Sequence, residues 1–217
     1  MIIELAGVSG SGKTTLGKTA SAMMKRRGFE AAQLRKLAWL DMLEQEEADR
    51  LFDERYPGAT EALLGLPKRK SPEKRHAPLV RQLWMSSQPM LRPNLAAIFD
   101  EGFFHRAAHL AAAGGSFEEY VSALELAPKA DVILLTSVPL EIAEERVVER
   151  MEEHRREKRR YRFRAMADIN RGAAEYMKNA LPFMEKAGAV TAHFDGQQPF
   201  RGPMAKLSKE LAAKFLG

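Results

Sequence analysis

The chain contains no cysteine among its 217 residues. Disulfide bonds and thiolate metal sites are therefore excluded, and a reducing cytoplasm is the expected compartment. No apolar run approaches the roughly 18 residues that a membrane-spanning helix needs, so no membrane partner is expected. The N-terminal run MIIELAG lacks the basic start and the small-residue cleavage site of a signal peptide, and we interpret it as the first strand of the fold.

The chain also lacks a balance between its charges. Its formal net charge is +5 and its isoelectric point is near 9.4, which favours anionic partners such as nucleotides or nucleic acid. Hydrophobic residues make up 45% of the chain and charged residues 29%, which is ordinary for a globular protein with a buried core. The length fits a single α/β domain over residues 1–217 with a lid.

Short apolar runs alternate along the chain with longer amphipathic segments, a rhythm typical of a parallel sheet covered by helices. The predicted strands are residues 2–6, 29–34, 95–99, 131–138 and 189–194. The predicted helices are residues 13–27, most of 36–66 with an interruption at 56–58, 79–91, 104–113, 117–126, 139 to about 158, 165–187 and a short C-terminal helix. Ligands of such folds bind at the carboxyl ends of the strands.

The segment GVSGSGKT, residues 7–14, follows the first predicted strand and opens the first predicted helix. It matches the phosphate-binding pattern G-x-x-x-x-G-K-[ST], whose glycines let backbone N–H groups approach a phosphate. Lys13 is the candidate catalytic cation for the β- and γ-phosphates of ATP, and the Thr14 hydroxyl is a candidate Mg²⁺ ligand. Ser9, Ser11 and Thr15 are either ligands or loop and cap residues. The expected ATP-binding residues here are Gly7, Ser9, Gly10, Ser11, Gly12, Lys13, Thr14 and Thr15.

Two adjacent carboxylates, Asp100 and Glu101, follow the apolar run of the third strand and resemble a Walker B strand end. An acid at this point can hold Mg²⁺ or accept the proton of an attacking hydroxyl. We give Asp100 the more central role, as metal ligand and catalytic residue, because it directly follows the strand. Which of the two is the base stays open. Arg106 is a candidate ligand for an anionic acceptor, and the five histidines show no zinc-ligand spacing.

Arginines crowd the segment HRREKRRYRFR that begins at His154. Their planar guanidinium groups bind phosphate oxygens in pairs, so the segment is a candidate lid, about residues 146–164, over the transferring phosphoryl group. The alternative is a solvated helix face paired with neighbouring glutamates. The candidate roles are catalysis for Arg159 and Arg160, ATP binding for Arg155 and acceptor binding for Arg162.

Several segments in order resemble the nucleotide-kinase branch of P-loop proteins, above all thymidylate-kinase-like enzymes. They are GVSGSGKTT, FDEGFFHR, LLTSVPLEIAEERVVER, INRGAAEYM and HFDGQQP. The resemblance implies a three-layer P-loop NTPase fold with a five-stranded parallel sheet in the order 2-3-1-4-5 and a helical, arginine-rich lid. It also implies ATP and Mg²⁺ as cofactors and a homodimer as one option. By the same resemblance, Arg35 would bind the substrate, and Asp195 and Gln197 would bind ATP near the adenine. The acceptor site would form in residues 36–92.

Three functions fit these patterns. The first is an ATP- and Mg²⁺-dependent kinase of a nucleotide or a nucleotide-like small molecule, with Arg81 as a further candidate acceptor ligand. The second is a kinase that phosphorylates a hydroxyl on nucleic acid, for example a hydroxymethylated base in DNA, bound through the basic loop 68–76 together with Arg92 and Trp84. The alternative for that loop is a plain solvated surface. The third is a regulatory NTPase, although the guanine-specifying pattern N-K-x-D is missing.

Overall fold

The structure is a computed structural model, and it describes residues 1–34, 43–66, 77–88, 92–153 and 167–217. Its centre is a five-stranded parallel sheet with the strand order β2-β3-β1-β4-β5. The strands are β1 (Ile2–Ala6), β2 (Glu30–Gln33), β3 (Leu95–Asp100), β4 (Val132–Ser137) and β5 (Val190–Asp195). The predicted P-loop NTPase fold and its sheet order are confirmed.

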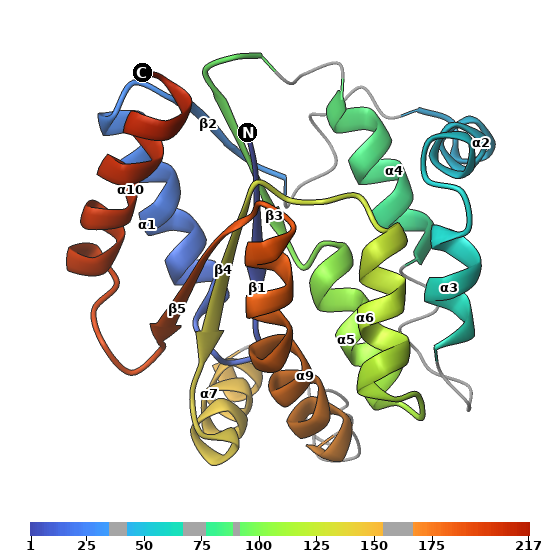
Figure 1. Cartoon of the computed structure of the whole chain (residues 1–217). Helices are drawn as coiled ribbons and strands as arrows, with labels where there is room; N and C mark the ends of the chain where they lie inside the picture. The colour runs from blue at the N-terminus through green and yellow to red at the C-terminus, as the bar shows by residue number, and fades with distance from the viewer. Residues whose placement is uncertain (35–42, 67–76, 89–91, 154–166) are drawn as a thin grey trace.

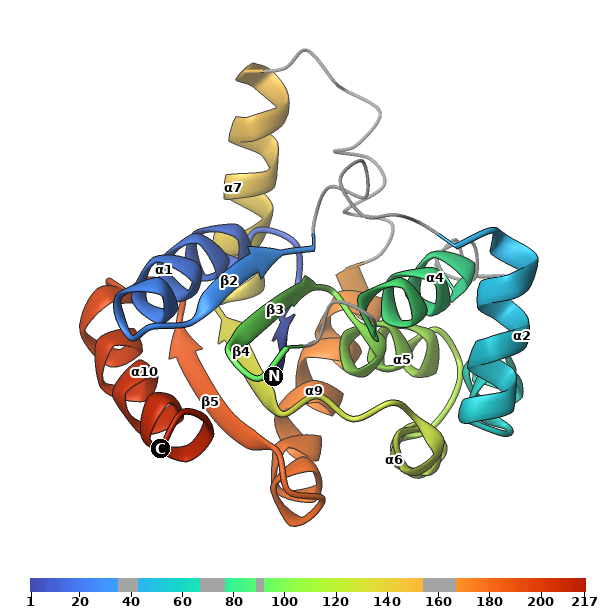
Figure 2. The same cartoon turned by 90° about the horizontal axis from the view of Figure 1, so that it is seen from above.

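Helices cover both faces of the sheet and make a three-layer arrangement (Figure 1). One face carries α1 (Lys13–Arg26) and α10 (Arg201–Phe215). The other carries α5 (Phe103–Ala112) and α9 (Ala167–Lys186), with α6 (Phe117–Leu126) beside them. The helices α2 (Gln45–Arg55), α3 (Ala59–Gly65) and α4 (Ala77–Ser87) pack outside this second layer. Figure 2 shows α7 (Leu140–Glu153) projecting from the carboxyl end of β4.

The apolar core lies in two large clusters, one on each face of the sheet. Side chains alternate between the faces along β1, as the pleat of a strand requires. Ile3 and Leu5 pack toward α1 and α10, while Ile2 and Ala6 pack toward α5 and α9. Glu4 shares the parity of Ile2 and Ala6, so its carboxylate lies in the second layer and is almost completely buried.

Most predicted elements are present with boundaries shifted by a few residues at most. The interruption predicted at residues 56–58 is confirmed, because α2 ends at Arg55 and α3 begins at Ala59. The third strand runs one residue further than predicted and includes Asp100. The predicted loop at residues 67–76, the predicted helical residues 36–42 and 89–91, and the predicted helix beyond residue 153 lie outside the described residues. No helix in the described part of the chain combines the length and the apolar character needed to cross a membrane.

Candidate functional site

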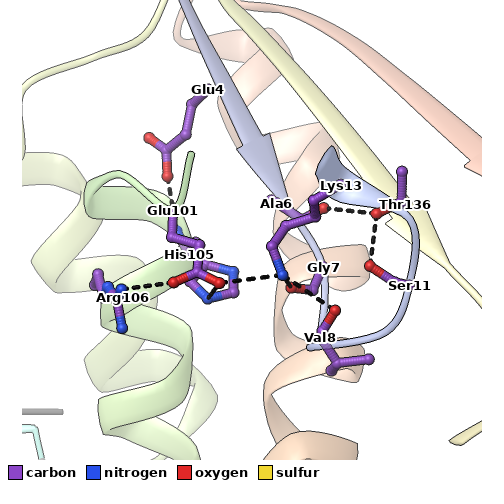
Figure 3. Close-up of polar contacts among 10 residues, drawn as sticks. All are labelled: Glu4, Ala6, Gly7, Val8, Ser11, Lys13, Glu101, His105, Arg106 and Thr136. Atoms are coloured by element: carbon purple, nitrogen blue, oxygen red, sulfur yellow. Dashed lines mark hydrogen bonds and ion pairs between the residues drawn. The ribbon is translucent and has the colours of Figure 1, made fainter. Parts of the chain in front are cut away.

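Two loops meet where β1 and β3 end side by side in the sheet (Figure 3). The first is the phosphate loop, residues 7–14, which joins β1 to α1. The second is the β3–α5 turn, residues 100–103, which joins β3 to α5. The two strands are parallel neighbours, with Leu5 opposite Asp100, so their carboxyl ends deliver both loops to the same edge of the sheet.

The phosphate loop takes its shape from glycine. Gly7, Gly10 and Gly12 have φ values of 132°, 86° and 102°, in the region that L side chains rarely adopt. Gly10 also lies so close to the backbone of Ala143 in α7 that any side chain would collide with it. The loop therefore exposes its backbone as a phosphate cradle needs, and α7 packs directly against it.

Helix α1 begins at Lys13, directly after the loop. Gly12 is the N-cap residue, and within the described residues no side chain caps the helix and no acid lies in its first turn. The N–H groups and the positive dipole end of a helix that begins in this way are suited to an anion. This arrangement fits the phosphate groups of a nucleotide.

The ammonium of Lys13 bridges the two loops. Its Nζ donates to the carbonyl oxygens of Gly7 at 2.6 Å and Val8 at 3.1 Å, and it lies 3.2 Å from Oε1 of Glu101. The Lys13 side chain is 8% exposed and that of Glu101 26% exposed. A buried ammonium surrounded by oxygen atoms is a preorganised cation at the point where phosphate charge would be bound.

The hydroxyl of Ser11 braces the loop against β4. Its Oγ lies 2.7 Å from Oγ1 of Thr136, and the Thr136 hydroxyl donates to the carbonyl oxygen of Ala6 at 3.2 Å. Both side chains are buried. These contacts agree with the loop-residue interpretation of Ser11, while its predicted role in ATP binding stays a prediction.

The turn after β3 takes its shape from charged side chains. Glu101 has φ 68°, the only positive φ of a non-glycine residue in the described parts of the chain. Its Oε2 lies 2.6 Å from a guanidinium nitrogen of Arg106, and its Oε1 is shared between Lys13 and the more distant Nε2 of His105 at 3.8 Å. A strained backbone at a cluster of charges is characteristic of functional sites.

The electrostatic surroundings keep Glu101 ionised. Burial alone would raise the pKa of its carboxyl group, but the positive charges of Lys13 and Arg106 outweigh burial and hold that pKa well below its ordinary value. Burial lowers the pKa of His105 well below its usual value, so its imidazole is neutral at physiological pH. The site therefore presents one carboxylate between two cations.

The contacts bear on the choice between the two acidic residues. Asp100 is the last residue of β3 and is partly buried, as its place at the strand end predicts. Glu101, to which sequence reasoning gave the second place, is the carboxylate that contacts Lys13 and Arg106. These contacts place Glu101 between the two cations, while the metal-binding role of Asp100 and the identity of the base stay predictions.

The turn after β5 closes over the phosphate loop. Gly196 lies against the backbone of Ser11 with no room for a side chain, and its N–H donates to the carbonyl oxygen of Ser137 at 2.8 Å. Arg146 of α7 joins the two segments, since its guanidinium donates to the carbonyl oxygens of Gly196 at 3.0 Å and Gly10 at 3.4 Å. Asp195 accepts a hydrogen bond from the N–H of Gln197 at 2.8 Å in this turn. Asp195 and Gln197, which were predicted to lie near the adenine, thus flank Gly196, which contacts the phosphate loop.

The remaining predicted residues fall into three groups. Ser9 and Thr15 are exposed and Thr14 is partly buried, all in or beside the phosphate loop. Arg81 lies on α4, where its guanidinium binds Asp49 at 2.9 Å and Thr60 at 3.1 Å, so in this structure it ties α2, α3 and α4 together. The predictions that lie outside the described residues concern Arg35, Arg155, Arg159, Arg160, Arg162 and the basic loop 68–76.

Sequence reasoning missed two residues that shape the site. Thr136 was assigned only to the apolar fourth strand, and its contact with Ser11 of the phosphate loop was not predicted. Glu4 was assigned only to the first strand. A single charged residue inside the apolar run MIIELAG could have indicated a buried carboxylate with specific partners. The Glu4 carboxylate lies at the start of α5 (Figure 3).

The oxygen donors of the site fit a magnesium ion held jointly with a nucleotide. Within the described residues no group of three or more His, Cys, Asp or Glu could hold a metal ion. Mg²⁺ in nucleotide sites needs only one or two protein oxygens, because phosphates and water supply the others. The hydroxyl of Thr14 and the carboxylate of Asp100 are donors of this kind.

Comparison with known proteins identifies relatives among the thymidylate kinases. A comparison with models of protein families finds no match. Thymidylate kinase of Xylella fastidiosa (strain M12) is 27% identical over 157 residues, which is 69% of this chain and 64% of that protein. Probable thymidylate kinase of Archaeoglobus fulgidus is 26% identical over 155 residues, which is 69% of this chain and 70% of that protein. The chain thus spans about two thirds of the length of these relatives, and the predicted resemblance to thymidylate-kinase-like P-loop proteins is confirmed.

Proposed function

We propose that the protein is an ATP- and Mg²⁺-dependent kinase that transfers the γ-phosphoryl group to a nucleotide or a nucleotide-like small molecule. The observation that carries the proposal is the position of Lys13, whose Nζ lies between the carbonyl oxygens of the phosphate loop and the carboxylate of Glu101. A cation at that point serves both the phosphate donor and the acidic group that meets the acceptor.

The residues of the phosphate loop would bind and orient ATP. Backbone N–H groups of residues 7–14 and the start of α1 hold the phosphates, and Lys13 exchanges its loop carbonyl partners for phosphate oxygens. A bound Mg²⁺, held through Thr14 and Asp100, would neutralise phosphate charge. The Ser11–Thr136 contact and Arg146 keep the loop in this shape before ATP arrives.

Glu101 and Arg106 would act on the acceptor side. When Lys13 turns to the phosphates, the Glu101 carboxylate loses one cationic neighbour and becomes a better proton acceptor for an attacking hydroxyl. If the acceptor is itself a phosphate, Arg106 can offer its guanidinium while Glu101 holds that guanidinium in place.

The acceptor class is supported by the relatives. The relatives are named thymidylate kinases, so a nucleotide is the first acceptor to test. The helices α2, α3 and α4 form a separate layer beyond α5, which carries Arg106, and the Arg81–Asp49–Thr60 contacts fix them to one another.

A transfer assay tests the proposal. The protein would receive γ-labelled ATP and Mg²⁺ with nucleosides, nucleotides, plain DNA or hydroxymethyl-modified DNA, and the Lys13→Ala variant would run in parallel. We expect label on a nucleotide with the wild-type protein and none with the variant. Label on DNA alone would replace the small acceptor by a nucleic acid, and label only in free phosphate would overturn the kinase assignment in favour of an NTPase.

A further inference from the structure

Glu4 is a charged residue in the middle of the central strand. It is 1% exposed and lies in β1 opposite Phe99 of β3 and Ile133 of β4. A carboxylate costs free energy when it is removed from water unless hydrogen bonds and charges compensate it. Burial raises the pKa of Glu4 from 4.5 to about 7, against the opposing effects of two backbone N–H groups and of Arg106.

The partners of Glu4 are the first N–H groups of α5. Its Oε1 accepts from the N–H of His105 at 2.9 Å, and its Oε2 accepts from that of Phe104 at 3.3 Å. Gly102 is the N-cap residue of α5, and as a glycine it has no side chain that could cap the helix. Glu4 therefore caps α5 from a neighbouring strand.

The approach of Glu4 depends on Gly102. A Cβ atom at residue 102 would lie 2.6 Å from Cδ and 2.7 Å from Oε2 of Glu4, closer than side chains approach one another. The carboxylate thus occupies the space that any larger residue in the turn would need. Glycine at residue 102 and glutamate at residue 4 form one packing unit.

Strand β1 holds the β3–α5 turn at both ends. On the strand side, the N–H of Glu101 donates to the carbonyl oxygen of Leu5 at 3.2 Å. On the helix side, the N–H groups of Phe104 and His105 donate to Glu4. Two adjacent residues of β1 therefore fix the segment that contains Glu101, whose φ of 68° is unfavourable without such support.

We propose that Glu4 is a positioning residue that holds Glu101 and Arg106 in their geometry toward Lys13 by capping α5 from β1. The inference rests on the proposed function, because the residues that Glu4 positions are those assigned to phosphoryl transfer. Because Glu4 is buried and its carboxylate accepts from backbone N–H groups, it would act through the backbone of residues 101–106. Among the described residues, the charge of Arg106 of α5 lowers the pKa of Glu4, and Glu4 in turn helps to raise the pKa of Tyr120 of α6. The Tyr120 hydroxyl donates to the carbonyl oxygen of Phe104 at 3.1 Å.

The test compares Glu4→Gln and Glu4→Leu with a variant that loses stability elsewhere. Gln keeps a carbonyl oxygen for one N–H group, whereas Leu keeps neither acceptor. Leu211→Ala removes a buried side chain of α10 on the opposite face of the sheet and controls for lost stability. Amide hydrogen exchange at Phe104 and His105 reports the cap without any need for activity.

We expect Glu4→Leu to lose protection at both amides and to lower kcat about 10- to 100-fold with little change in KM for ATP. Glu4→Gln should keep protection at one of the two amides and retain a kcat between those of Glu4→Leu and the wild type. Leu211→Ala should leave kcat unchanged. If Glu4→Leu does not fold, the split between the two amides in Glu4→Gln decides the result.

Two outcomes would overturn the inference. One is unchanged exchange at both amides in the Glu4 variants. The other is lost protection with wild-type kcat, which would leave Glu4 as a structural cap alone. If the wild-type protein transfers phosphate to no acceptor, the proposed function fails, and with it the role of Glu4 in positioning catalytic residues. The exchange data would still show whether Glu4 caps α5, so the two failures can be told apart.

Discussion

The phosphate loop and the β3–α5 turn lie side by side at the carboxyl edge of the sheet, but they are built in different ways. The loop owes its shape to glycines with positive φ and to backbone atoms in close contact. The turn owes its shape to the charged side chains of Glu4, Glu101 and Arg106, which come from β1, the turn itself and α5. A site can thus combine a half that is encoded locally with a half that is assembled from distant residues, and Lys13 joins the two.

The largest expected effect comes from removing that joining residue. Lys13→Ala should lower phosphoryl transfer at least about 1,000-fold, because one preorganised cation at the transferring group is lost. Steady-state transfer of label from ATP measures it. Lys206→Ala, at an exposed lysine of α10, is the matched control and should keep full activity. Near-normal transfer by Lys13→Ala would remove the link between the two loops from the mechanism.

The turn can be tested by neutralising its two carboxylates separately. Glu101→Gln should lower kcat about 100-fold while ATP still binds, because the group between Lys13 and Arg106 loses its charge. Asp100→Asn should also lower kcat, with a stronger dependence on Mg²⁺ concentration if it holds the ion. Glu125→Gln, at an exposed site on α6, is the control. Wild-type kcat in Glu101→Gln would show that its contacts serve only the fold.

Glu4 of β1 and Glu101 of the turn should change stability with pH in opposite directions. The pKa of Glu4 is raised from 4.5 to about 7, so the folded protein keeps a proton that the unfolded chain releases. The free energy of unfolding should therefore fall by up to about 3 kcal/mol as pH rises through this window. Glu101 has a lowered pKa, so its contribution is present above its ordinary pKa of 4.5 and is lost as pH falls.

Denaturant unfolding between about pH 3 and pH 8 covers both windows and separates the two effects. Glu4→Gln should flatten the decline in stability toward high pH, since the variant has no proton to release. It should leave the loss of stability in acid in place. An unchanged slope between wild type and Glu4→Gln would mean that the buried carboxyl titrates as it does in the unfolded chain.

The smallest expected effect tests the glycine-built loop. Gly10→Ala should lower the free energy of unfolding by at least about 2 kcal/mol, because a positive φ and the backbone of Ala143 both oppose a side chain. Gly202→Ala in α10 is the control, since nothing lies within 4 Å of its added methyl group. It should be neutral or slightly stabilising. Equal stability of the two variants would show that the phosphate loop adapts more readily than its glycines indicate.

Much of the fold could be predicted because its signals are local. The apolar runs predicted the five strands correctly, and the predicted range 2–6 matches β1 to the residue. The segment with the G-x-x-x-x-G-K-[ST] pattern lies between β1 and α1, as its place in the sequence predicted. The order of the strands came from the resemblance to a known family and not from the residues alone. The preference for Asp100 over Glu101 rested on distance from the strand end, and the contacts of Glu101 with Lys13 and Arg106 could not be read from that distance.

The sequence by itself determined the phosphate loop, because the loop needs a backbone conformation that side chains rarely adopt and the sequence places glycine at residues 7, 10 and 12. Only the tertiary structure decided the β3–α5 turn. Its geometry depends on Glu4, about 100 residues away in the chain, whose carboxylate reaches α5 only after β1 and β3 have paired. Backbone conformation is a property of neighbouring residues, whereas the pairing of charges depends on which strands lie side by side.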